Sequence, residues 1–201
     1  ILFRIGRSAV ETTLKEIVGS AGLDPRFFPY LSHREQYLMQ WDLDIELGGR
    51  YIKASTREKR EMLSGEFAAY LPDVSRFKYP SVARFPEQIG WFLSAEQVCR
   101  VAGSIVRDAG WDARQPALKV LSINATFGGF GDLVTSYTGV KFGSDTGCQA
   151  VLILAELKKG EWISFCLVAN TEPGQETRLD SPAFGYLIQR LFLLALCGKL
   201  E

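Results

Sequence analysis

The pattern of hydrophobic and polar positions divides the chain into a helical first part and a mixed second part. Apolar residues recur at helical spacing over residues 8–19, and Ser32 with Glu35 has the spacing of a capping box that opens a helix. Residues 43–53 instead alternate between apolar and polar side chains, which predicts a strand or hairpin. We therefore expect residues 1–71 to be mostly helical, with one extended segment.

Prolines and aromatic side chains are concentrated in residues 72–93, between the two parts. This density of proline excludes a continuous helix or a central strand, so the segment is expected to be an ordered, irregular connector. Its aromatic residues include Phe77, Tyr79, Phe85 and Trp91. They pack the connector onto the protein, or they form the core of an interface with a protein partner. A third hypothesis is that these aromatic side chains stack on the bases of single-stranded nucleic acid, with Arg76, Lys78 and Arg84 nearby.

The second part begins with a helix. Ser94 and Gln97 have capping-box spacing, and Gly110 is placed to end the helix that they open. Residues 118–125 are apolar, which favours a buried strand. Residues 128–147 are rich in glycine and are expected to form a loop region.

A β-hairpin and a final helix complete the pattern. Residues 148–157 and 162–170 flank a short turn sequence, which predicts two antiparallel strands. Asp180-Ser181-Pro182 then starts a helix with a cap followed by proline. Its expected buried stripe is Phe184, Leu187, Ile188, Leu191 and Ala195. We predict an α+β fold with a largely antiparallel sheet and packed helices, in which residues 94–201 form the core or continue one domain.

Charge and composition narrow the class of protein. Lys plus Arg and Asp plus Glu both number 23, so a binder of duplex nucleic acid is not expected. The longest apolar run, residues 191–197, is too short to span a bilayer.

The four cysteines are spread without a Cys-x-x-Cys pair, which indicates free thiols in a soluble protein of a reducing compartment, the cytoplasm or an organelle matrix. Because His33 is the single histidine, we predict no metal site. The chain starts at Ile1 with neither Met nor a leader, as a trimmed or processed N-terminus would.

The segment 127–133, Phe-Gly-Gly-Phe-Gly-Asp-Leu, is the most unusual local feature. Its glycines allow the main chain to approach a phosphate or a cofactor closely. The spacing of these glycines matches neither the dinucleotide-binding fingerprint nor the P-loop. The alternative to cofactor binding is that the segment forms a tight turn with close strand packing. The candidate cofactor-binding residues are Gly128, Gly129, Gly131 and Lys141, and the candidate catalytic residues are Tyr137 and Asp132.

Two short elements are similar to those of penicillin-interacting serine enzymes. Ser122-Ile123-Asn124 resembles their S-x-N element, and Lys141-Phe142-Gly143 resembles K-T-G with a different middle residue. Their nucleophile is a serine with a lysine three residues on, whereas Ser55 is followed by Lys59. Without that lysine Ser55 is not activated, so we do not predict this chemistry.

Residues 98–157 resemble the cofactor-binding core of corrinoid-dependent reductive dehalogenases and epoxyqueuosine reductases, which have a nitroreductase-like fold. The pieces that carry the resemblance are the helix end 101–113, the apolar Leu121-Ser122-Ile123, the loop 129–133 and the strand 150–157. The resemblance implies a flat cofactor, a corrinoid or a flavin, against Gly129, Gly131 and Asp132, with Tyr137 as proton donor. The Cys-x-x-Cys-x-x-Cys runs of those enzymes are absent, so no iron–sulfur cluster is implied.

Two functions therefore stay open, and the sequence does not decide whether the protein is an enzyme. The first is a cofactor-binding, reductase-like domain, intact or degenerate, that uses the loop 128–131. The second is a non-catalytic subunit or protein-interaction module of a larger assembly. The second rests on the near absence of histidine, on the lack of a complete catalytic constellation and on the aromatic connector 72–93.

Overall fold

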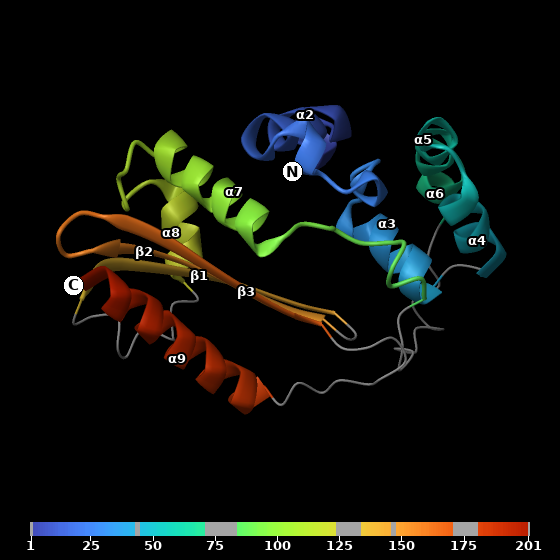
Figure 1. Cartoon of the computed structure of the whole chain (residues 1–201). Helices are drawn as coiled ribbons and strands as arrows, with labels where there is room; N and C mark the ends of the chain where they lie inside the picture. Colours follow the sequence, from blue (N-terminus) through green and yellow to red (C-terminus); the bar gives the residue numbers. More distant parts are fainter. Residues whose placement is uncertain are drawn as a thin grey trace. The chain divides into compact units, whose positions relative to one another are not determined.

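The protein has an α+β fold, as predicted, with its helical part first and its sheet second (Figure 1). The computed structural model describes residues 2–42, 45–70, 84–123, 134–145, 148–170 and 181–200. The chain divides into two compact units, Ile1–Leu93 and Ser94–Glu201. The predicted division at a connector stays a prediction, because residues 71–83 lie outside the described ones.

The first unit is built from short helices and turns. They are α1 Leu2–Ile5, α2 Arg7–Val18, the 3-10 turns Ser20–Gly22 and Pro25–Phe27, α3 His33–Tyr37 with a π-helical turn Leu38–Asp42, α4 Ile45–Lys53, α5 Thr56–Ser64 and α6 Glu66–Ala69. The capping box of Ser32 and Glu35 is formed at the start of α3. Leu31, Leu38, Met39, Tyr51, Leu63, Phe67 and Ile89 form the core of this unit.

The strand or hairpin predicted for residues 43–53 is wrong, because residues 45–53 form helix α4. Leu47 and Tyr51, four residues apart, both pack into the core cluster, which is the spacing of a helix face. Gly48 is needed there for close packing, since a Cβ at this position would lie 2.8 Å from Cε2 of Phe85. Contacts with residues far along the chain therefore outweigh the local alternation.

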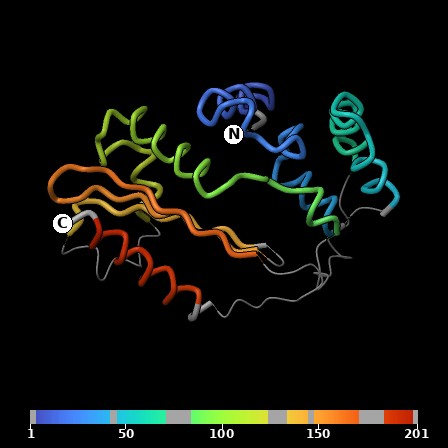
Figure 2. Tube along the Cα trace, in the orientation of Figure 1, coloured from blue at the N-terminus to red at the C-terminus, as the bar shows by residue number. Residues whose placement is uncertain are grey.

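The second unit places a three-stranded sheet between helices. Its elements are α7 Ala95–Asp108, α8 Pro116–Ser122, β1 Thr135–Asp145, β2 Cys148–Leu157, β3 Trp162–Asn170 and α9 Ser181–Leu200. The strand order is β1-β2-β3 with both pairs antiparallel. Helix α9 covers one face of the sheet and α7 with α8 the other (Figures 1 and 2).

Alternate residues of the central strand β2 supply both cores of this unit. Val151, Ile153 and Ala155 pack with α9. Leu154 packs on the opposite face with α7 and α8. Because β2 is covered on both sides, it is apolar almost throughout, and this explains why the hairpin was predicted correctly.

Two predictions for the segment before this hairpin are wrong. Residues 118–125 were expected to form a strand, but Pro116–Ser122 is helix α8, in which Leu118 and Leu121 pack on one side. Proline at the first helical position and apolar residues three apart favour that helix. The glycine-rich loop expected over residues 128–147 is a strand from Thr135 to Asp145, and residues 124–133 lie outside the described ones.

The buried stripe of α9 differs in part from the expected one. Phe184, Ile188, Phe192 and Leu196, four residues apart, face the sheet. Leu187 and Ala195, which were expected inside, are exposed. Of the helices in the described ranges, none combines the length and the apolar character needed to cross a membrane.

Candidate functional site

Most of the predicted cofactor site lies outside the described residues. Gly128, Gly129, Gly131 and Asp132 all fall in the segment 124–133. The two remaining candidates, Tyr137 and Lys141, lie on β1 and point to the same face of the sheet, because strand residues four apart share a face.

Tyr137 is buried in the second unit, with 8% of its surface exposed. Its hydroxyl donates a hydrogen bond of 2.7 Å to the carbonyl of Leu118 in α8, and its ring lies 5.2 Å from that of Trp162. Desolvation by burial raises the pKa of Tyr137 to about 12. These contacts are those of a packing side chain, and its role as a catalytic proton donor stays a prediction that they do not support.

We expect Tyr137→Phe to lower the unfolding free energy of the second unit by about 1–2 kcal/mol at neutral pH, because the Leu118 carbonyl loses its donor. The folded state also favours the neutral phenol, so Tyr137 contributes stability below pH 10 that is lost as the pH rises toward 12. The part of the alkaline loss that is due to Tyr137 should be missing from the variant, while the part due to Cys166, whose pKa burial raises to about 11, should remain. Urea unfolding followed by circular dichroism across this pH range measures both effects.

The matched control is Tyr186→Phe, since the Tyr186 ring on α9 is largely exposed. This variant should keep the alkaline loss of the unchanged protein. Equal alkaline behaviour of the Tyr137 variant and the control would contradict the burial argument.

Gly139 on β1 has no side chain, and the space beside it is filled by other side chains of the protein itself. A Cβ there would lie 2.9 Å from Cβ of Leu121 and 3.0 Å from Cζ of Tyr137. The lack of a side chain at Gly139 therefore lets α8 and the Tyr137 ring pack against the strand.

Lys141 is exposed, and its Nζ donates to the carbonyl of Phe142 at 2.6 Å. Two residues on, a Cβ added to Gly143 would meet no atom within 4 Å. Lys141 and Gly143 are thus exposed on β1, which is an edge strand among the described residues, whereas Phe142 between them packs against the core under α9. Ser122, at the end of α8, donates its hydroxyl to the carbonyl of Lys119 at 2.8 Å.

The sequence contains an S-x-x-K motif at a serine other than Ser55. Ser75-Arg76-Phe77-Lys78 has the S-x-x-K spacing, and it precedes the elements at Ser122 and Lys141. The sequence signal that identifies it is the lysine three residues after Ser75. The motif lies outside the described residues.

The described end of the aromatic connector packs onto the first unit. Ile89 is fully buried, and Phe85 packs against the same core cluster. The indole of Trp91 donates to the carbonyl of Leu31 at 3.0 Å. These contacts favour the packing reading for residues 84–93, while the protein-partner role of the whole connector stays a prediction.

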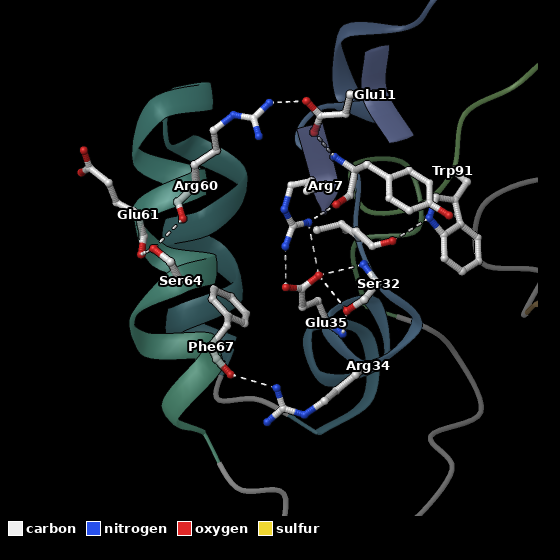
Figure 3. Close-up of polar contacts among 12 residues, drawn as sticks. Arg7, Glu11, Ser32, Arg34, Glu35, Arg60, Glu61, Ser64, Phe67 and Trp91 are labelled. Carbon is white, nitrogen blue, oxygen red and sulfur yellow. Dashed lines mark hydrogen bonds and ion pairs between the residues drawn. The ribbon is translucent and has the colours of Figure 1, made fainter. Parts of the chain in front are cut away.

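An ionic cluster joins three helices of the first unit (Figure 3). Arg7 on α2 pairs with Glu35 on α3 at 2.7 Å and also donates to the carbonyl of Tyr30. Glu11 accepts a hydrogen bond of 2.8 Å from the Tyr30 amide and pairs with Arg60 on α5. Each carboxylate is thus used by at least two donors of the protein itself, which indicates a structural role.

The four cysteines all lie in the second unit. All four are free thiols. Burial raises the pKa of Cys166 to about 11, with a smaller effect from Cys99. In these ranges, no His, Cys, Asp and Glu side chains cluster in a way that would hold a metal ion.

The two edge strands of the sheet, β1 and β3, differ in the features that protect an edge strand from pairing with another chain. Strand β1 carries Lys141, two glycines and a register shift between Thr135 and Tyr137. Strand β3, with the sequence WISFCLVAN, contains no charged residue, proline or glycine. Within the described part of the chain, β3 pairs with β2 alone. Because charges, prolines and bulges are what protect an edge from pairing, β3 is an unprotected edge.

No family model and no curated protein matches this chain.

Proposed function

We propose that the second unit is a non-catalytic interaction module that adds a strand of a partner protein to its edge strand β3. The observation that carries the proposal is the nine-residue β3, which lies at the edge of the sheet and has no charge, proline or glycine. In strand addition, main-chain hydrogen bonds give affinity, and pockets for alternate side chains give specificity.

The burial of β3 supports the same proposal. Ile163, Phe165 and Leu167 point to the α9 face, but they are only partly buried. Trp162 on the other face is also partly buried, against the core beneath α7 and α8. An added strand with apolar side chains would extend both cores, because paired antiparallel residues share a face.

A peptide copying Trp162–Asn170, with a dye and a lysine tail, tests this function by fluorescence anisotropy at low protein concentration. We expect binding to the unchanged protein and a Kd higher by at least about tenfold for Ser164→Lys. Ser164 is exposed on β3, so a lysine there does not disturb the core but places a charge beside the incoming strand.

Ser144→Lys is the matched control, because it makes the same change at an exposed serine of the other edge strand, β1. It should bind the peptide as the unchanged protein does. The proposal fails if the unchanged protein does not bind, or if the two lysine variants behave alike.

The cofactor-binding, reductase-like function also stays a proposal. It rests on Gly128, Gly129, Gly131 and Asp132, together with the exposed ammonium of Lys141. Protein purified with a bound corrinoid or flavin would absorb visible light. A colourless protein that takes up neither compound would contradict it.

A further inference from the structure

We propose that the strand added to β3 is the β3 of a second copy of this chain, so that two sheets join into one six-stranded sheet. This inference rests on the proposed function and names its partner. An isologous dimer requires a surface that is complementary to itself, because the same residues meet on both sides of a twofold axis.

The charge of β3 fits such self-pairing. A strand with a lysine or a glutamate at its centre would face its own charge across the axis, and like charges opposite each other destabilise a strand pair. The nine residues Trp162–Asn170 include no charged side chain, so two copies can meet without that repulsion.

The side chains of β3 also fit each other in an antiparallel pair. A twofold axis at Cys166 places Phe165 opposite Leu167 of the second copy, and Ile163 opposite its Ala169. All four of these residues lie on the α9 face, where they are partly buried in a single copy. The pairing would therefore set apolar side chains against apolar side chains on the layer that is incompletely covered.

Further apolar surface is available on that layer. Helix α9 exposes 46% of Leu187 and 68% of Leu194, seven residues apart on its outer side. These two exposed leucines are apolar surface on the outer side of α9 that is available to a further partner.

Sedimentation of the full chain over a concentration series from about 1 to 100 μM tests this inference. We expect a reversible dimer, and we expect Ser164→Lys to raise its dissociation constant by at least about tenfold. Ser144→Lys on β1 should leave it unchanged. Circular dichroism establishes that each variant is folded, and Asn170→Lys, at an exposed position of β3, replaces Ser164→Lys if that variant does not fold.

The outcomes separate the two proposals. A monomer that still binds the β3 peptide overturns the dimer and leaves strand addition standing. A monomer that does not bind the peptide overturns both. A dimer that resists the β3 variants, or that weakens equally with Ser144→Lys, forms through another surface and overturns the inference.

Discussion

Gly139→Ala should lower the unfolding free energy of the second unit by about 2–4 kcal/mol, through overpacking and the strain it places on a buried hydrogen bond. The new Cβ would lie 2.9 Å from Cβ of Leu121 and closer still to the Tyr137 hydroxyl. Neither neighbour can move easily. The Leu121 atom that would contact the new methyl group is its Cβ, which is attached directly to the main chain. The Tyr137 hydroxyl is held by its hydrogen bond to the carbonyl of Leu118. Chemical unfolding monitored by circular dichroism measures the loss.

Gly143→Ala is the matched control on the same strand, because no atom lies within 4 Å of its Cβ. It should change stability by less than about 0.5 kcal/mol. The double variant Gly139→Ala with Tyr137→Phe should lose less than the sum of the single losses, because removing the hydroxyl removes one of the clashes. Equal effects at the two glycines would show that Gly139 is not closely packed.

Elements whose signals are local could be predicted from the sequence. The helix after Ser94 has a capping box with Gln97, and both hydrogen bonds of that box are formed. The hairpin of β2 and β3 has a short turn between two apolar strands. In both cases a few neighbouring residues determine the conformation, so no knowledge of distant contacts is needed.

Elements whose conformation depends on distant contacts could not be predicted from the sequence. The short apolar segment that forms α8 is compatible with a strand or a helix, and packing of Leu118 and Leu121 against β1 decides between them. Gly139 looks like a loop glycine until Tyr137 and Leu121 are known to lie against it. The absence of charge in β3 is visible in the sequence, but it matters only because the strand order places β3 at an edge.

Glu35→Ala should lower the unfolding free energy of the first unit by about 2–4 kcal/mol, because it leaves a charged group without its partner in a mostly buried position. The guanidinium of Arg7, whose side chain is 20% exposed, would lose its carboxylate. The Ser32 amide would lose the capping acceptor at the start of α3 as well. Urea unfolding followed by far-ultraviolet circular dichroism measures the loss.

Glu58→Ala separates the two causes, since Glu58 occupies the same place in the capping box of Ser55 but lies exposed on α5. That variant should lose only about 0.5–1 kcal/mol, the contribution of a capping interaction at a helix start. The excess loss at Glu35 then measures the ion pair with Arg7, and it should shrink when Arg7 is replaced by methionine in the same protein, because no unpaired charge remains. Similar losses at Glu35 and Glu58 would mean that the cluster joining α2, α3 and α5 contributes little to the stability of the first unit.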